Sequence, residues 1–385
     1  MKVRLKDAFD LQMGKTPARN MPAYWDGEHK WISIADIGCS GKYITTTKER
    51  ITDKAITESG IRAVPARTVI MSFKLSIGKT AITSEEMYTN EAIMAFVNKE
   101  TYDIDTDYLY HLCCGTEWTE GTNKAVMGLT LNKATLSEKR ISLPEITEQR
   151  NIAAKFDALD NVIEKTQAEL SSLDQLVKSR FVEMFGDPAQ NPMGWPMRRL
   201  SDVCTKLTDG THFSPESFPE GDYKYITAKN IKIDGFDFSD LTYVPESVHR
   251  PIYERCDPEY GDILYIKDGA TTGIAMINSL DEEFTMLSSV ALLKHDRSII
   301  NGQYLKALLN FPTFYHSMRS NMGGAAITRL TIKKLCATSV PVPPIEHQEA
   351  FATFVIQSDK SKLAVQQSLE KLETLKKSLM QQYFG

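Results

Sequence analysis

The chain has 385 residues, more than one hydrophobic core usually serves, so we expect two to four domains. Its 42% hydrophobic and 25% charged residues are typical of a globular protein, and a net charge of −5 argues against a nonspecific nucleic-acid binder. No apolar run reaches the roughly 18 residues of a membrane span, and residues 1–7 do not resemble a secretory signal. We therefore expect a cytoplasmic protein.

Residues 1–143 form the first predicted module. Short β-type runs, among them residues 31–37 and 68–72, alternate with Gly, Asp and Thr turns, and residues 108–112 are typical of a helix. Its polar loops supply candidate ligand-binding side chains, because Arg, Lys, Asn, Ser and Thr contact phosphates and base edges. These candidates are Lys15, Thr16, Arg19, Lys74, Ser76, Lys79, Thr80, Asn123 and Lys124.

Residues 148–185 form one predicted helix within a spacer segment that covers residues 144–186. Its apolar residues recur in alternating steps of four and three, which is the 3.5-residue period of a coiled-coil seam. The residues expected in this seam are Ile152, Phe156, Leu159, Ile163, Thr166, Leu170, Leu173 and Val177. A helix with this pattern needs a partner for its apolar stripe.

Residues 187–342 form the second predicted module. Residues 187–196 contain three prolines and one glycine, which end the helix and begin a new domain. The module repeats the β-type runs of the first one, while its polar loops differ in sequence. Its candidate binding residues are Thr211, His212, Thr227, Lys229, Asn230, Lys267, Thr271, Thr272, Arg319, Asn321, Thr328 and Arg329.

Residues 343–385 repeat the spacer helix. The segment beginning at Leu143 and ending at Gly186 aligns without gaps on the segment beginning at Val342 and ending at Gly385, at a constant offset of 199 residues. Its predicted seam residues are Phe351, Val355, Val365, Leu369 and Leu372, while Lys362 and Lys376 also fall on seam positions. Leu363, Leu375 and Leu379 indicate that this second apolar stripe drifts toward a period of 3.6.

The duplication predicts an α+β architecture. We expect two similar mixed α/β recognition modules joined by two long helices that pair antiparallel within one molecule, with a pseudo-twofold axis between the halves. Shared strands with divergent loops are typical of modules whose loops determine specificity. The competing interpretation of each candidate residue is a solvated turn, and seam residues are expected only to pack.

The sequence contains no recognisable catalytic or metal-binding motif. Residues 76–80 end like a phosphate-binding loop, but Phe73 occupies the position of the required upstream glycine. The seven histidines show no paired ligand spacing, and the cysteines Cys39, Cys113, Cys114, Cys204, Cys256 and Cys336 show no CxxC spacing. We therefore expect no bound metal, no disulfide framework and no cofactor on this chain, and we favour a recognition subunit over an enzyme.

The chain resembles the DNA specificity (S) subunits of type I restriction-modification systems. The resemblance rests on residues 208–212 (TDGTH), 261–264 (GDIL), 323–327 (GGAAI) and 340–348 (VPVPPIEHQ), and on the corresponding spacer segments 143–150 and 179–188. The order of these motifs covers nearly the whole chain. In the first module, residues 14–17 (GKTP) and 66–69 (ARTV) stand in place of the first two motifs.

The resemblance implies two target-recognition domains that each bind half of an asymmetric bipartite sequence in double-stranded DNA. It also implies that the helices set the spacer between the half-sites and dock two methyltransferase subunits, which carry S-adenosylmethionine and flip the target adenine. Restriction/translocase subunits would use ATP and Mg²⁺. Two alternatives are a specificity module of a type II-like restriction system and a coiled-coil adaptor that binds no DNA.

Overall fold

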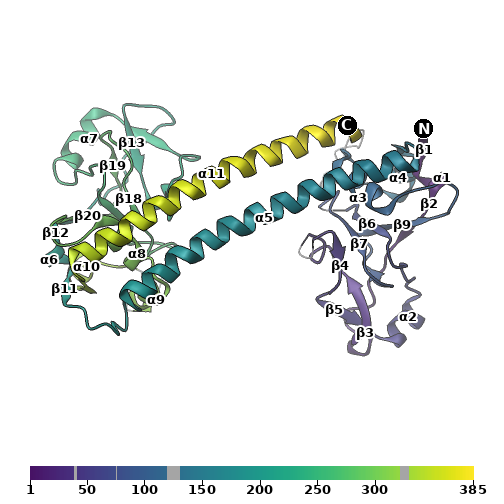
Figure 1. Cartoon of the computed structure of the whole chain (residues 1–385), viewed down its shortest axis with the longest axis horizontal. Coiled ribbons are helices and arrows are strands. Elements are labelled where there is room, and N and C mark those ends of the chain that lie inside the picture. The colour runs from purple at the N-terminus through teal and green to yellow at the C-terminus, as the bar shows by residue number, and fades with distance from the viewer. Residues whose placement is uncertain (39–40, 75, 119–130, 321–328) are drawn as a thin grey trace. The chain divides into compact units, whose positions relative to one another are not determined.

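The protein is described here by a computed structural model that covers residues 1–38, 41–74, 76–118, 131–320 and 329–385. The chain divides into two compact units (Figure 1). Unit 1 contains residues 1–167 and 367–385, and unit 2 contains residues 168–366. Each unit therefore combines one predicted module with segments of both long helices.

The two long helices are continuous and equal in length. Helix α5 covers Ile146–Phe185 and helix α11 covers Ile345–Phe384, 40 residues each, so each is about 60 Å long. Helix α5 ends at Gly186, whose φ of +74° is the left-handed conformation that commonly terminates a helix. The sequence-based helix boundaries are confirmed to within two residues.

Burial along both helices follows the predicted heptad period. In α5, the predicted seam residues Ile152, Phe156 and Leu159 are buried, and the remaining five are half-buried. In α11, buried or half-buried positions again recur in alternating steps of four and three, at Phe351, Val355, Ser358, Lys362, Val365, Leu369, Leu372, Lys376, Leu379 and Tyr383. Positions near the two ends of the helix, among them Ala352 and Phe384, are buried or half-buried as well. The predicted drift to a period of 3.6 is wrong, because Leu363 is 60% and Leu375 49% exposed.

Within each unit, one end of α5 packs against the opposite end of α11. In unit 1, Phe156 of α5 stacks on Phe384 of α11, with ring centroids 5.5 Å apart. In unit 2, Phe181 of α5 packs edge-on against Phe351 of α11, with centroids also 5.5 Å apart. These contacts are those that an antiparallel pair requires at its two ends, while pairing along the full length of the helices stays a prediction.

Unit 1 contains a five-stranded sheet, a three-stranded sheet and a two-stranded sheet, with strand orders β2-β9-β6-β7-β4, β5-β3-β8 and β1-β10. The elements before α5 are β1 (Lys2–Arg4), α1 (Leu5–Ala8), β2 (Phe9–Met13), η1 (Pro22–Tyr24), β3 (Trp25–Ile32), β4 (Tyr43–Ile44), β5 (Glu49–Ile51), α2 (Asp53–Ser59), β6 (Val69–Ser72), β7 (Thr80–Thr83), β8 (Tyr88–Thr89), β9 (Ile93–Asn98), α3 (Thr106–Gly115), α4 (Lys133–Glu138) and β10 (Arg140–Ser142).

Unit 2 repeats this plan with strand orders β12-β20-β17-β18, β16-β13-β19 and β11-β21, and adds the hairpin β14-β15. Its elements before α11 are β11 (Met197–Arg199), α6 (Leu200–Val203), β12 (Cys204–Asp209), β13 (Tyr223–Ile226), η2 (Ala228–Asn230), β14 (Ile231–Lys232), β15 (Gly235–Phe236), β16 (Thr242–Val244), α7 (Glu246–Tyr253), β17 (Ile263–Ile266), β18 (Ala275–Ile277), β19 (Thr285–Met286), β20 (Val290–His295), α8 (Gly302–Leu309), α9 (Pro312–Ser320), α10 (Ile332–Ala337) and β21 (Ser339–Pro341).

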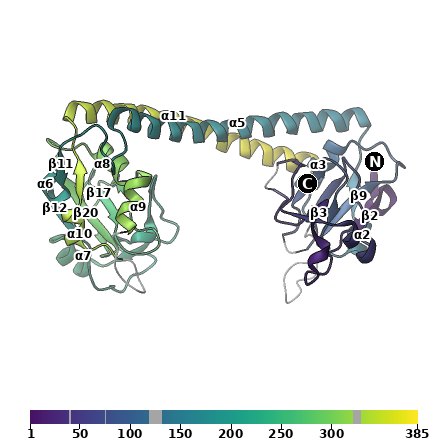
Figure 2. The ribbon, with the colours of Figure 1, turned by 90° about the horizontal axis from the view of Figure 1, so that it is seen from below.

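The larger sheet of each unit is buried on both faces. In unit 2, Ile263 and Tyr265 of β17 pack into a core with α8 and the ends of α5 and α11, whereas Leu264 and Ile266 pack against the small sheet. The helices on one face of this sheet can be followed in Figure 2. Unit 1 has the same division. Because successive strand residues point to opposite faces, two cores per sheet require the nearly continuous apolar runs seen in β6 and β17.

A buried glutamine fixes the start of each long helix to its module. The side-chain oxygen of Gln348 accepts a hydrogen bond from the backbone N–H of Asn301 (2.8 Å), and its amide donates to the carbonyls of Ile299 and Pro343. Gln149 in unit 1 makes the same set of bonds, to the N–H of Asp105 and the carbonyls of Asp103 and Pro144. Duplicated sequence positions therefore carry duplicated contacts.

The strand register corrects the predicted alignment of the modules by one residue. Val69 pairs with Phe96 and Ile263 with Leu293 at corresponding places, so Val69 corresponds to Ile263 and not to Leu264. Arg67, with φ of +54°, then corresponds to Gly261, with φ of +89°, where the sequence alignment had placed Ala66. A shift of one residue moves every side chain of a strand to the opposite face of the sheet. Only the register seen in the structure therefore places the apolar side chains in their observed cores.

Candidate nucleic-acid interface

Two loops leave the larger sheet at matching places in both units, where the first strand ends and where the central strand turns. Gly14 and Gly210 follow the first strands β2 and β12, and the next residue of each donates its N–H to Thr89 or Met286, respectively. A Cβ on Gly210 would lie 2.0 Å from the Met286 carbonyl oxygen, and one on Gly14 would lie 2.2 Å from that of Thr89. Glycine is therefore required for this close approach of two backbones.

In unit 2, a buried ionic network joins the end of β12, the loop after β17 and Arg329. Lys267 Nζ lies 3.4 Å from Asp209 and 3.1 Å from Asp268, and all three side chains are at most 12% exposed. Asp268 also lies 3.7 Å from the guanidinium of Arg329, whose side chain is 66% exposed. Lys267 is thus a structural cation beneath the surface, whereas Arg329 faces solvent.

The structure adds Arg255, which the sequence did not indicate. It follows α7, donates hydrogen bonds to the Gly210 carbonyl and to Thr208, and lies 3.5 Å from Asp209. Its side chain is 46% exposed. No motif or periodicity marks this arginine, because its partners lie 45 or more residues away in the chain.

Several predicted binding residues of unit 2 instead hold the loops in shape. Thr211 is buried and forms an isolated bridge with Leu287, and Thr272 is buried and donates to the Gly269 carbonyl. Asn230 is buried and accepts hydrogen bonds from the N–H and hydroxyl of Thr227, which closes a capping box around η2. These side chains have positioning roles in the isolated chain; whether they contact a ligand stays a prediction.

Arg319 also contributes to the shape of the loop between β17 and β18. One of its guanidinium nitrogens donates to the carbonyls of Ala270 (3.0 Å) and Thr272 (2.9 Å). The exposed predicted residues are His212, 70% exposed and 3.2 Å from Asp209, Lys229, paired with Asp240 at 2.6 Å, and Thr271. Among the predicted residues of unit 2 that the structure describes, these three and Arg329 are the most accessible to a ligand.

In unit 1, the loop after β2 carries three predicted residues with intramolecular partners. Lys15 bonds to the carbonyl of Ser59, and Thr16 donates to Glu91. Arg19 forms a two-nitrogen ion pair with Glu49, and its guanidinium carbon lies 4.1 Å from the ring centroid of Trp25. Lys15 and Arg19 are nevertheless exposed, so both remain accessible.

The β6–β7 turn of unit 1 contains the other predicted residues. Thr80 is buried and donates to the Gly78 carbonyl, whereas Ser76 and Lys79 are exposed. Lys74 is half-buried, with its ammonium 5.2 Å from the ring centroid of Phe73. Strands β6 and β7 pair antiparallel on either side of this turn, so residues 76–80 belong to a strand-turn-strand and not to a loop between a strand and a helix.

The two units carry different side chains at corresponding positions of their sheets. By the same strand register, Met13 of unit 1 takes the place of Asp209, and Phe73 takes the place of Lys267. Unit 2 therefore has a buried ion pair at a site where unit 1 has an exposed methionine and a buried phenylalanine. Different side chains on one shared framework are expected of two modules that recognise different targets.

Four predicted binding residues lie outside the described residues. They are Asn123, Lys124, Asn321 and Thr328. The motif residues 323–327 lie there as well.

The described residues contain no cluster of three or more His, Cys, Asp or Glu side chains placed to hold a metal ion. Among the same residues, no helix combines the length and apolarity needed to cross a bilayer. The five described cysteines are free, and burial raises the pKa of Cys256 to about 12. Thiols with raised pKa values are poor nucleophiles.

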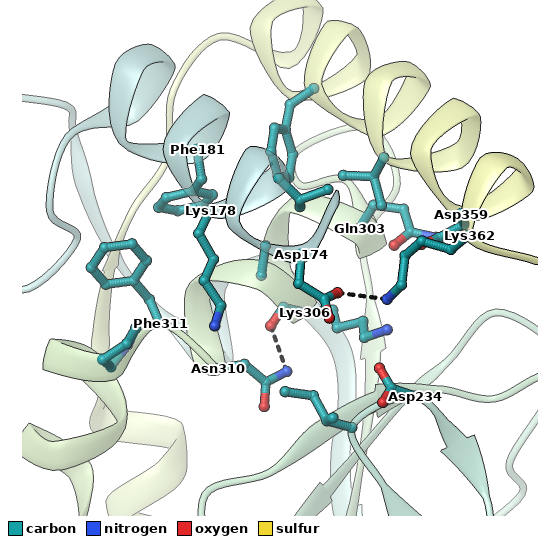
Figure 3. Close-up of a pocket in the computed structure, with 16 residues that line it drawn as sticks. Asp174, Lys178, Phe181, Asp234, Gln303, Lys306, Asn310, Phe311, Asp359 and Lys362 are labelled. Carbon is teal, nitrogen blue, oxygen red and sulfur yellow. Dashed lines mark hydrogen bonds and ion pairs between the residues drawn. The ribbon is translucent and has the colours of Figure 1, made fainter. Parts of the chain in front are cut away.

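A cavity of about 150 Å³ lies in unit 2 among α5, α8 and α11, away from the loops described above (Figure 3). Lys306 lines it together with Asp234 and Asp359, and the predicted seam residues Val177, Phe351 and Val355 form part of its wall. Burial lowers the pKa of Lys306, although Asp359 and Asp234 oppose this effect. The cavity is a feature of the helix packing rather than of the candidate interface.

The comparison with known proteins shows the same duplication as the fold. The family model described as "Type I restriction modification DNA specificity domain" matches residues 1–175 and again residues 192–374. The specificity subunit of type I restriction enzyme MjaIX from Methanocaldococcus jannaschii is 24% identical over 380 residues, which cover 91% of this chain and 85% of that protein. The MjaVIII specificity subunit of the same organism is 20% identical, over 98% of this chain and 90% of its own length.

Two solved structures share the fold over the whole chain. The S subunit of a type I restriction-modification system from M. genitalium is 16% identical, with a TM-score of 0.57 and 96% of its chain covered. A chain from a structural study of complex assembly and conformational transition of the type I R-M system is 18% identical, with a TM-score of 0.63 and 97% covered. Because both copies of the family model match and together span most of the sequence, the chain belongs to the family of type I restriction-modification DNA specificity subunits.

Proposed function

We propose that this chain selects the DNA sequence on which a type I restriction-modification complex acts. Unit 1 binds one half of an asymmetric bipartite target in double-stranded DNA, and unit 2 binds the other half. The observation that carries this proposal is the pair of matching frameworks with different side chains at the same place, Met13 and Phe73 against Asp209 and Lys267. Family membership supports the assignment to DNA.

The two long helices set the distance between the half-sites and dock two methyltransferase subunits. Their exposed faces are rich in charged and polar side chains, which suits a wet protein-protein interface. Catalysis belongs to the partners: the methyltransferase subunits bind S-adenosylmethionine, and restriction/translocase subunits use ATP and Mg²⁺. Because this chain carries a net charge of −5, basic surfaces of the partners supply many of the phosphate contacts. The complex works in the cytoplasm, where its DNA is found.

Replacing one module tests the division of labour. The chain is co-expressed with its methyltransferase subunits, and methylated adenines are mapped across the genome. Exchange of residues 198–342 for the corresponding segment of another specificity subunit is expected to change one half of the methylated sequence only. A change in both halves contradicts independent reading by the two units, and the absence of any sequence preference in the unaltered complex contradicts the proposed function itself.

Shortening the helices tests their role as a spacer. Removal of one heptad from α5 and the matching heptad from α11 shortens each helix by roughly 10 Å, or about three base pairs. The mapped target is expected to keep both half-sites and to lose about three base pairs from its spacer. An unchanged spacer in a complex that still methylates DNA shows that another element sets this distance.

A further inference from the structure

A surface groove in unit 2 lies between the loop that follows β12 and helix α7. It has a volume of about 430 Å³, and Thr211, His212, Phe213, Val248 and Arg255 contribute to its lining. Phe213 is 60% exposed, so its ring is accessible to a partner at this groove. The groove adjoins the loop after β12, which carries the predicted binding residues Thr211 and His212.

Arg255 is held at this groove by partners that fix its guanidinium group. It donates to the Gly210 carbonyl and to the Thr208 hydroxyl, and Asp209 lies 3.5 Å away. Asp209 is only 6% exposed and is held in turn by Lys267. The carboxylate thus lies beneath the surface while the guanidinium, 46% exposed, remains open to solvent.

The charges favour an anionic or electron-rich partner above this network. Its cations are Lys267, Arg255 and Arg329, and its anions are Asp209 and Asp268. The carboxylates are nearly buried, whereas the two arginines are about half and two-thirds exposed, so the accessible face is positive. An arginine whose planar fork is already oriented loses little entropy when it binds the two acceptors of a guanine edge.

We propose that Arg255 is a specificity-determining residue that binds the N7 and O6 atoms of a guanine in the half-site of unit 2, with Asp209 and Lys267 as its positioning residues. The proposal rests on the proposed function, since it assumes that unit 2 binds DNA. It assigns the surface of α7 beside Phe213 to the recognition interface, in addition to the loops at the strand ends.

Arg250, which lies in α7 five residues before Arg255, provides a matched control. Its side chain is 49% exposed, similar to that of Arg255, but its guanidinium pairs with Glu246 and Glu283 and lies outside the groove lining. Three variants are compared in the assembled complex with methyltransferase subunits: Arg255→Ala, Arg255→Met, which keeps an unbranched stem but has no hydrogen-bond donor, and Arg250→Ala. Matching thermal unfolding curves show that the variants fold, and Arg255→Met decides if Arg255→Ala does not fold.

The binding probe is a duplex that carries the target found by methylation mapping. Each guanine of the half-site of unit 2 is replaced in turn by 7-deazaguanine, which lacks the N7 acceptor but keeps Watson-Crick pairing. The unaltered complex and Arg250→Ala are expected to lose roughly tenfold in affinity at one guanine. Both Arg255 variants are expected to be insensitive to that replacement and to bind the unmodified duplex about tenfold more weakly.

Three results overturn the assignment of Arg255. The first is that Arg255→Met keeps the same sensitivity to 7-deazaguanine as the unaltered complex. The second is a uniform loss of affinity for all duplexes, specific and scrambled, which identifies a phosphate contact instead. The third is a half-site of unit 2 without any G·C pair. In contrast, an unaltered complex that fails to distinguish target from scrambled duplex contradicts the proposed function and not merely this residue.

Discussion

Lys376 Nζ of α11 lies 2.5 Å from Asp160 Oδ1 of α5 within unit 1, although Lys376 occupies a seam position where the heptad pattern calls for an apolar side chain. Lys362 occupies another such position in unit 2 and lies 2.6 Å from Asp174 of α5. In each unit a lysine of α11 therefore reaches an aspartate of α5. A polar pair in a seam typically selects one register at a cost in stability.

We predict that Asp160→Ala lowers the free energy of unfolding of unit 1 by about 1 kcal/mol, because it leaves a partly buried ammonium group without its partner. Lys376→Leu is expected to be neutral or slightly stabilising, since it restores an apolar seam. Chemical denaturation of the full chain measures both. If Lys376→Leu costs as much as Asp160→Ala, the ion pair itself contributes net stability.

The buried amide of Gln348 gives a second prediction. Gln348→Ala removes three hydrogen bonds and leaves the N–H of Asn301 and two carbonyls without this partner, so we expect a loss of roughly 2–4 kcal/mol in the stability of unit 2. Gln357→Ala, at an exposed position of the same helix, is expected to change it by less than about 0.5 kcal/mol. Similar unfolding curves for the two variants contradict the anchoring role of Gln348.

A third prediction concerns pH. The His111 side chain is 1% exposed, stacks on Phe156 and lies 2.7 Å from Asp157. Burial lowers the pKa of His111, and the hydrogen bond that its Nε2 makes to Asp157 only partly opposes this. Because the folded pKa lies below the unfolded value of about 6.5, the unfolded state binds more protons between these two values. Stability is therefore full above about pH 6.5 and is lost as the pH falls toward the folded pKa.

Unfolding of His111→Gln, measured at pH 7.5 and 5.5, tests this sign. The variant is expected to be less stable at pH 7.5 but to lose less stability on acidification than the unaltered chain does. His316→Asn changes an exposed histidine and is the control for general effects of histidine removal. An equal loss on acidification in His111→Gln and the unaltered chain excludes His111 as a source of the pH dependence.

The fourth prediction concerns the loop after β12. Gly210→Ala places a Cβ 2.0 Å from the Met286 carbonyl oxygen, so the backbone must shift, and we expect a loss of about 3 kcal/mol together with weaker sequence discrimination by unit 2. At Gly194, φ is +67° and the space for a Cβ is open, so Gly194→Ala is expected to cost only about 1 kcal/mol. Thermal unfolding that ranks the two variants in the opposite order contradicts the close approach at Gly210.

Sequence patterns predicted the features that depend on local repetition. The constant offset and the heptad spacing gave both long helices, because helix period and termination depend on residues only a few positions apart. The same offset paired Gln149 with Gln348, and the structure shows that both make the same anchoring contacts. The heptad pattern also shows the two lysines of α11 as exceptions in the seam. It does not identify their aspartate partners, because these belong to the other helix.

The alignment of the modules and the roles of their polar residues required the tertiary structure. Pairing Thr68 with Ile263 was one residue out, because a strand shifted by one position keeps its composition and changes only the face that each side chain occupies. Thr211, Asn230 and Thr272 were polar loop residues in the sequence, and the structure buries them as parts of the loop framework.

Sequence by itself determined that this chain carries two copies of one framework and two long helices, since duplication and period are properties of the linear order of residues. Tertiary structure decided which charged groups face solvent. Arg255 and Asp209 are 46 residues apart, and Lys267 lies a further 12 residues along the chain. A network of this kind forms only when separate loops of the sheet come together, because charge contacts act through space over a few ångströms and not along the chain.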